Sequence, residues 1–384
     1  MSIEKGELGQ ATIDACLAMG FACAGIARAE PTSRRVEFME WIGDGRHGDM
    51  AFMTEYVEER LDVRKLLPGA RSVIVVADQY AVRGDEDVDD DGANVRIARY
   101  ARGRDYHSVI KARLHALCDR LREVVPRETG TEGMRFRAFV DTGPAMEREH
   151  AARAVMGGAF VGKHTLLIHP RMGSWLLLGG VATTLELLDG GDAEVMHRRD
   201  ACATRTVDHC GTCTRCIDAC PTGAIAAEGW SVDATKCVSY LTLEHRGAVD
   251  ERFHAAIGDR LIGCDECQAV CPFNAPHGGP ADAAEERVNP AYADHEGLRA
   301  RLPILDVLKW REEDRARVLS GSAAKRASLE MIKRTAVINA ANAWRSSRDA
   351  ALVRAIETVR DDAAEPALVR ETARRALDTM DGQA

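Results

Sequence analysis

The sequence predicts three consecutive domains: an α/β domain over residues 1–195, a ferredoxin-like domain for two iron–sulfur clusters over residues 196–300, and an all-α domain over residues 301–384. Strand-like and helix-like segments alternate in the first region, as they do in α/β domains. Eight of the twelve cysteines crowd into residues 210–271, with Gly and Pro between them. In the last region, Ala, Arg and Leu recur at helical spacing, which indicates packed helices.

The first region contains three short apolar runs, over residues 21–26, 73–76 and 136–140. We expect the second and the third to form strands. A helical pattern precedes the first run, and another over residues 108–125 lies between the second and third. Short, bounded and β-branched runs such as 73–76 are typical of buried strands.

The eight clustered cysteines form two runs with the spacing of bacterial ferredoxins. The runs are Cys210-x2-Cys213-x2-Cys216-x3-Cys220-Pro221 and, with its leading member displaced upstream to Cys237, Cys264-x2-Cys267-x3-Cys271-Pro272. In ferredoxins, three thiolates of a run hold one 4Fe–4S cluster and the fourth crosses to the other cluster. This rule assigns one cluster to Cys210, Cys213, Cys216 and Cys271. It assigns the second cluster to Cys220, Cys237, Cys264 and Cys267.

A pair of zinc sites with four cysteines each is the alternative, because C-x2-C pairs also build zinc ribbons. Zinc ribbons usually use two separated C-x2-C pairs, whereas further cysteines at these spacings followed by Pro favour iron and sulfide. The remaining cysteines are isolated, and we interpret them as core residues: Cys16, Cys23, Cys118 and Cys202.

We expect three helices in the last region, over residues 329–344, 349–359 and 367–380. Stacked helical hairpins of the HEAT type fit this pattern, so the domain is predicted to be HEAT-like.

Hydropathy and charge exclude some classes of protein. No apolar run reaches the ~18 residues that a membrane span needs, and the longest, residues 175–188, is interrupted by Gly, Thr and Glu. Residues 1–10 lack the basic flank and apolar core of a signal peptide, so we expect a cytoplasmic protein. Thiols stay reduced in that compartment, so clustered cysteines indicate metal or redox chemistry rather than disulfides. The net charge of −9 argues against general adhesion to nucleic acids but allows a local basic patch.

Motifs spread over most of the chain match one family of enzymes. The matching segments are 47–53 (HGDMAFM), 60–70, 99–107 (RYARGRDYH), 141–144 (DTGP), 147–149, 162–168 (GKHTLLI), 173–175, 210–213, 239–242, 244–247, 263–265 and 321–326 (GSAAKR). Through them the sequence resembles epoxyqueuosine reductase, a cobalamin-dependent iron–sulfur enzyme of tRNA modification. It departs from that family at Phe160 and His164, where Trp and Asn are usual beside the expected cofactor pocket.

The resemblance implies that the α/β domain binds cobalamin and that the chain reduces epoxyqueuosine to queuosine at the wobble position of tRNA. The reaction removes the epoxide oxygen as water and consumes two electrons and two protons. A cluster passes electrons singly, whereas the cobalt of cobalamin can collect them and attack an epoxide carbon. We also expect an external low-potential electron donor and a monomeric protein.

An epoxide oxygen is a poor leaving group unless it is protonated, so a general acid is needed near it. The family match gives this role to Asp141, whose pKa would have to be raised by burial or by neighbouring charge. The other interpretation of Asp141 is a turn residue before Thr-Gly-Pro. The resemblance also implies contacts to cobalamin by Arg60, Asp141, Lys163, Thr165 and Asp265.

We expect no histidine ligand on the cobalt. Histidine-ligated cobalamin proteins carry Asp-x-His-x-x-Gly, and the nearest match, Asp105-Tyr106-His107, has Ile110 at the glycine position.

Residues 320–348 carry six basic side chains and one acidic side chain, Glu330. Four of the basic residues recur at about two helical turns and can share one face: Lys325, Arg326, Lys333 and Arg334. We expect this face to bind tRNA phosphates while the unstacked wobble base reaches a buried cofactor. The alternative is an ordinary solvated helix surface.

Two other functions fit part of the sequence. A ferredoxin-like electron carrier without cobalamin explains the eight cysteines and none of the flanking motifs. A cobalamin and iron–sulfur reductase of another substrate, such as an organohalide, explains more, but reductive dehalogenases typically carry a twin-arginine leader that residues 1–10 do not show.

Overall fold

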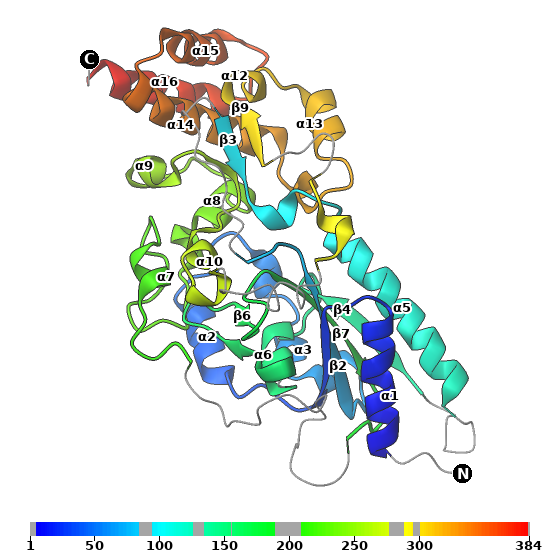
Figure 1. Cartoon of the computed structure of the whole chain (residues 1–384). Helices are drawn as coiled ribbons and strands as arrows, with labels where there is room; N and C mark the ends of the chain where they lie inside the picture. The colour runs from blue at the N-terminus through cyan, green and yellow to red at the C-terminus, as the bar shows by residue number, and fades with distance from the viewer. Residues whose placement is uncertain are drawn as a thin grey trace.

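The structure is a computed structural model. It describes residues 5–83, 94–125, 134–154, 156–188, 209–275, 288–294 and 300–382. Figure 1 shows a sheet domain at one end and a group of helices at the other, with the cysteine-rich segment between them.

The sheet domain is built on four antiparallel strands in the order β1-β2-β7-β4. The strands are β1 (Cys23–Arg28), β2 (Ser72–Gln79), β4 (Phe136–Val140) and β7 (Leu176–Thr183). Every residue of β2 is buried, as its β-branched composition predicts. The two predicted strands are confirmed as β2 and β4, and the apolar run over residues 21–26 overlaps β1. The sequence did not predict β7, which lies in the run first considered as the longest apolar stretch.

Two glycines let neighbouring elements pack closely against β7. A Cβ atom at Gly179 would lie 2.6 Å from Cγ2 of Ile110, and one at Gly180 would lie 2.7 Å from the carbonyl oxygen of Ile74. Gly180 pairs with Val75 on one side and Phe139 on the other. The glycines that broke the apolar run therefore belong to the centre of the sheet.

Helices cover both faces of this sheet. Helices α1 (Lys5–Ala18) and α5 (Tyr106–Val124) pack on one face, and α6 (Glu147–Arg153) packs on the other (Figure 1). Asp105 caps α5, because its carboxylate accepts a hydrogen bond from the backbone N–H of His107 at 3.1 Å. This cap fixes the start of α5 beside the end of β4.

The cysteine-rich segment forms short elements. They are α7 (Arg215–Asp218), α8 (Val238–Leu243), α9 (His254–Ile257), β8 (Arg260–Ile262) and α10 (Glu266–Ala269). Helices α7 and α10 pack against each other, which brings the two cysteine runs together.

The three predicted C-terminal helices are confirmed as α14 (Leu329–Ser347), α15 (Ala350–Asp361) and α16 (Ala367–Asp381), and each packs against the other two. Ser328 and Asp349 cap α14 and α15 through their side-chain oxygens.

A second small sheet joins three distant parts of the chain. Strand β3 (Asn94–Ile97) pairs in parallel with β8 and antiparallel with β9 (Arg301–Pro303). Val95 and Ile97 share one hydrophobic core with residues of β8 and of the C-terminal helices. A segment from the predicted first domain therefore packs inside the other two.

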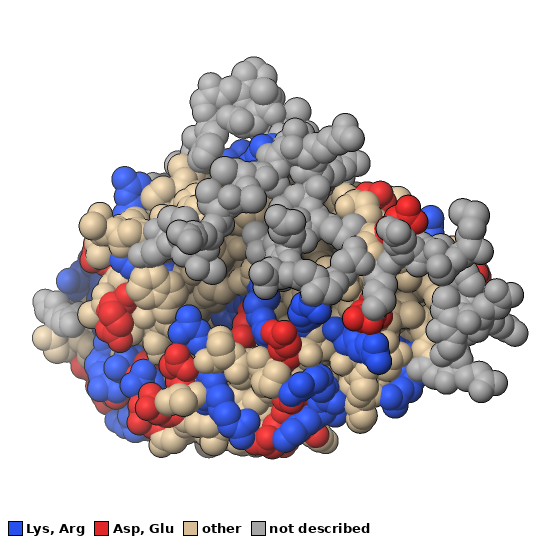
Figure 2. Space-filling view, turned by 90° about the horizontal axis from the view of Figure 1, so that it is seen from below, with Lys and Arg blue, Asp and Glu red and all other residues tan. Residues whose placement is uncertain are grey.

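Within the described residues, no helix combines the length and the apolar character needed to cross a bilayer. The view in Figure 2 shows acidic and basic side chains interspersed over the described part of that face.

Candidate active site

A cavity of about 2720 Å³ lies where the sheet domain, the cysteine-rich segment and residues 323–326 meet. Its wall is largely apolar, with contributions from Trp41, Met50, Phe160 and Leu178. Ligand pockets are typically about 300–1,000 Å³. This cavity is larger, so it has room for more than one molecule of that size.

Asp141 lies at the wall of this cavity, directly after β4. The following turn is closed by the backbone N–H of Gly143, which donates to the carbonyl of Val140 at 2.7 Å. The Tyr106 hydroxyl donates to Oδ2 of Asp141, and Nε2 of His107 lies 3.0 Å from Oδ1. The Asp141 side chain is 44% exposed, so a bound molecule can reach it.

These contacts move the pKa of Asp141 in the direction opposite to the prediction. Burial alone would raise the pKa of Asp141, but His107, Tyr106 and Arg326 together lower it below the ordinary value. Burial alone would lower the pKa of His107, but Asp141 and Asp105 raise it. The expected raised pKa is therefore wrong for Asp141 in this structure, and the pair holds its proton on the imidazole.

A second carboxyl group lines the same cavity. Glu147 begins α6, and burial raises its pKa, with the charge of Asp141 adding to the effect. Its ion-pair partner Arg148 lies 3.6 Å away. Neither Glu147 nor the pairing of His107 with Asp141 was assigned from sequence. Spacing does not show that the start of α5 and the turn after β4 meet.

Of the other expected cobalamin contacts, Arg60, Thr165 and Asp265 line the cavity. Arg60 donates to the carbonyl of Phe52 at 3.3 Å, and burial lowers the pKa of its guanidinium. The carbonyl of Thr165 accepts from Arg148 at 2.7 Å. Oδ2 of Asp265 accepts from the backbone N–H of Arg99 at 2.8 Å.

Lys163 differs from its expected role. Its Nζ donates to the carbonyls of Gly211 (2.7 Å) and Cys213 (3.1 Å), and it lies 5.4 Å from the Trp230 ring centroid. It is buried and supports the first cysteine loop instead of lining the cavity. A cation that satisfies two loop carbonyls fixes the loop's shape.

Phe160 and His164, where the sequence departs from the family pattern, also line the cavity. Nδ1 of His164 accepts from the backbone N–H of Leu166 at 3.2 Å, and burial lowers the pKa of His164 to about 4. The imidazole is therefore neutral and, with Nδ1 as acceptor, carries its hydrogen on Nε2. The Phe160 ring packs 4.5 Å from that of His209.

The cysteines divide into two groups by their position. The four assigned to the second cluster line the cavity: Cys220, Cys237, Cys264 and Cys267. Among the described cysteines, the other four assigned ligands stand away from it. Burial, together with the neighbouring thiols of Cys210, Cys216 and Cys213, raises the pKa of Cys271 to about 11. This proximity fits the crossover of Cys271, and the free thiols fit iron–sulfur ligation.

The expected basic face is wrong for two of its four residues. Lys333 and Arg334 are 1% and 0% exposed. Lys333 forms an ion pair with Glu365, and Arg334 donates to carbonyls of three residues: Leu241, His245 and Gly247. Helical spacing placed these side chains on one exposed face, but Arg334 packs against the cysteine-rich segment and Lys333 against Trp310 and Glu365.

Lys325 and Arg326 lie at the cavity instead. Lys325 pairs with Asp105 and Arg326 with Glu244, each at 2.6 Å, and both side chains remain substantially exposed.

Comparison with known protein families gives two matches. The family described as epoxyqueuosine reductase QueG, DUF1730, matches residues 60–142, and the 4Fe-4S double cluster binding domain matches residues 209–274. The second match confirms the two 4Fe–4S clusters over the zinc alternative.

Related proteins and structures agree. The chain is 36% identical to epoxyqueuosine reductase of Xanthomonas campestris over 92% of this chain and 90% of that protein. It is 33% identical to the Burkholderia pseudomallei enzyme, over 94% and 89%. A crystal structure of epoxyqueuosine reductase with an epoxyqueuosine-modified tRNA-Tyr stem loop superposes with a TM-score of 0.78 at 25% identity, covering 97% and 90% of the two chains. The chain belongs to the epoxyqueuosine reductase family.

Proposed function

We propose that the chain reduces epoxyqueuosine in tRNA to queuosine inside the large cavity, with Asp141 and His107 handling the protons. One observation supports this proposal above the others. The thiols of one cluster group and the carboxylate of Asp141 line the same cavity. Electrons and protons are thus delivered to the same space.

The residues around the cavity fit cobalamin. Arg60, Thr165 and Asp265 would hold its polar side chains, and the apolar wall would cover the corrin ring. Bound cobalamin supplies a cobalt centre that accepts single electrons and acts as a strong nucleophile. The cluster of Cys220, Cys237, Cys264 and Cys267, which we name the inner cluster, is placed to feed it. The cluster of Cys210, Cys213, Cys216 and Cys271, the outer cluster, is placed to receive electrons from an external low-potential donor.

The protein supplies the two protons that turn the epoxide oxygen into water. Asp141 is accessible from the cavity, and the two carboxylates that flank the ring of His107 raise the pKa of this residue, which favours its protonated form. When substrate displaces water, a proton moves from His107 through Asp141 to the leaving oxygen, and Asp141 returns to its charged form. His107 then takes a proton from solvent and passes it along the same route, which supplies the second proton. A proton held on a partly buried imidazole thus replaces the raised pKa that a lone carboxylic acid would need.

The substrate enters at the side of Lys325 and Arg326, whose exposed cations bind phosphates near the opening. We further place the chain in the cytoplasm, since its substrate is a tRNA, and we expect it to act as a monomer.

The decisive experiment is an anaerobic assay of cluster-loaded, cobalamin-loaded protein on tRNA carrying epoxyqueuosine, with nucleosides quantified after digestion. Conversion to queuosine that requires cobalamin is the expected result. Absence of conversion together with visible spectra that show no cobalamin bands after loading would instead favour a simple electron carrier. Conversion without cobalamin would remove this cofactor from the mechanism.

A further inference from the structure

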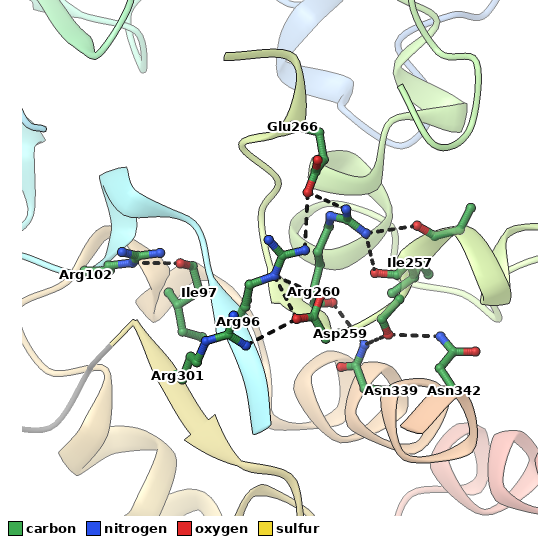
Figure 3. Close-up of polar contacts among 12 residues, drawn as sticks. Arg96, Ile97, Arg102, Ile257, Asp259, Arg260, Glu266, Arg301, Asn339 and Asn342 are labelled. Carbon is green, nitrogen blue, oxygen red and sulfur yellow. Dashed lines mark hydrogen bonds and ion pairs between the residues drawn. The ribbon is translucent and has the colours of Figure 1, made fainter. Parts of the chain in front are cut away.

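The carboxylate of Glu266 lies between two arginines, next to cysteines of the inner cluster. Glu266 stands between Cys264 and Cys267 in sequence and begins α10. Its Oε1 accepts from Nη2 of Arg96 at 3.2 Å and from Nη2 of Arg260. Figure 3 shows the two guanidinium groups converging on this one carboxylate.

The two arginines are fixed in place by further contacts. Arg96 Nε lies 2.8 Å from Asp259 Oδ2, and that carboxylate also contacts Arg301 at 3.5 Å (Figure 3). Arg260 donates through Nη1 to the carbonyl of Ile257 at 3.1 Å. The charges therefore cannot move freely away from the cluster-binding loop.

Helix α14 holds the same loop from the other side. Asn339 donates to the carbonyl of Gly258 at 2.7 Å, and Asn342 donates to Gly258 at 2.9 Å and to His254 at 2.7 Å. Figure 3 shows both amides pointing from α14 toward the segment that carries Asp259 and Arg260. The loop is thus tied to the C-terminal helices as well as to β3.

The three side chains are only partly exposed, at 27% for Arg96, 14% for Arg260 and 25% for Glu266. Charges in such positions are screened by salt less than surface charges are. The electrostatic effect of these charges on a nearby cluster is therefore larger than that of fully solvated charges.

We propose that Arg96, Arg260 and Glu266 set the reduction potential of the inner cluster. Reduction adds a negative charge to a cluster, so two fixed guanidinium groups favour the reduced state and the carboxylate opposes it. The triad carries a net charge of about +1, from two cations and one anion. The potential therefore depends on β3, a strand far from the cysteines in sequence. This inference rests on the proposed function only through the ligands of the inner cluster.

The test is a potentiometric titration of anaerobic, cluster-loaded protein followed by electron paramagnetic resonance. Glu266→Gln removes a negative charge at constant shape, so the midpoint potential of the inner cluster should rise. Arg96→Gln removes a positive charge, so it should fall. The outer cluster in the same molecule should keep its potential, and Glu251→Gln, which alters a distant carboxylate paired with Arg375, should change neither. Repeating the titration in a Cys271→Ala background assigns the signals to the two clusters.

Opposite shifts in the two variants support the proposal, because a purely structural role would not reverse sign with charge. Shifts of the same sign, equal shifts of both clusters, or no shift would overturn it. Should Arg96→Gln lose iron, Arg96→Lys keeps the charge and should leave the potential nearer to the wild type than Glu266→Gln does; a larger shift there would also overturn the proposal. Because the titration needs neither cobalamin nor tRNA, its failure is distinguishable from failure of the proposed function.

Discussion

Nε2 of His107 lies 3.0 Å from Oδ1 of Asp141, across the join between the start of α5 and the end of β4. Nδ1 of the same ring lies 2.6 Å from Oδ1 of Asp105. An imidazole with a carboxylate at each nitrogen binds its second proton more tightly than a free histidine does. Four predictions concern this site, the clusters and the tRNA, and a fifth concerns the helical region.

Asp141→Asn should abolish proton transfer at the cavity while keeping its shape. We expect turnover to fall by about 100-fold or more, since general acid–base groups typically contribute about 10²–10⁴-fold. Cobalamin loading, measured by visible spectra, and tRNA affinity, measured by anisotropy, should be retained. Asp119→Asn, an exposed carboxylate of α5, is the matched control. Unchanged single-turnover rates in Asp141→Asn would assign the proton to another group or to water.

Asp105→Asn should shift the pH dependence of the chemical step. The raised pKa of His107 keeps the proton at pH values where an ordinary histidine, with a pKa of about 6.5, has lost it. Turnover should therefore stay level at pH values below the raised pKa of His107 and fall as the pH rises through it. Asn still caps α5 but carries no charge, so the alkaline limb should move to lower pH. Superimposable single-turnover profiles would show that His107 does not supply the proton.

Cys271→Ala should damage the outer cluster and spare the inner one. Its thiol neighbours those of Cys210, Cys213 and Cys216, although Cys267 is nearer in sequence. Iron should fall from about eight to about four atoms per chain, with the inner cluster's resonance signal intact. Cys118→Ala, at a buried position of α5, should keep all the iron. Selective loss of the inner-cluster signal would refute the crossover.

Replacing Lys325 and Arg326 together with Ala should weaken tRNA binding. Each lost phosphate contact should flatten the plot of log affinity against log salt by roughly 0.7–0.9. Lys309→Ala, an exposed lysine away from the cavity, should leave the slope unchanged. Equal slopes for the double variant and the wild type would place the tRNA elsewhere.

Glu365→Gln should destabilise the helical region without affecting tRNA binding. The Glu365 and Lys333 side chains are 3% and 1% exposed, and the substitution leaves the ammonium with the Trp310 carbonyl at 3.3 Å. Breaking a buried pair typically costs about 3–5 kcal/mol. Asp378→Asn, which breaks an exposed pair with Arg374, should cost about 0–1 kcal/mol. Denaturant unfolding that shows equal losses for both variants would contradict this reasoning.

Local pattern predicted the elements well and their contacts poorly. The runs at 73–76 and 136–140 became strands because β-branched and aromatic residues favour buried strands whatever their partners. Strand β7 was missed because its paired glycines suggest a break, and only the closeness of Ile110 and Phe139 explains them. The spacing of the cysteines predicted the two clusters, since the separation of cysteines along each run reflects the geometry of cluster ligation.

Side-chain roles depended on tertiary contacts that spacing does not contain. Lys333 and Arg334 have the same helical spacing as an exposed basic stripe, yet the segment around Leu241 and Gly247 covers Arg334, and Lys333 is buried with Glu365. Lys163 lies in a family motif, but its ammonium donates a hydrogen bond to the backbone carbonyl of Cys213. The proton pair of His107 and Asp141 forms only when α5 is capped beside the end of β4.

The three-stranded sheet also constrains how the protein is made. As the chain leaves the ribosome, β3 emerges long before either of its neighbours, β8 and β9, has been synthesised. Until residues 260–262 and 301–303 appear, the apolar side chains of Val95 and Ile97 lack their final cover. An unpaired apolar strand is prone to aggregation. A fragment that ends at residue 195 should consequently depend on chaperones or precipitate.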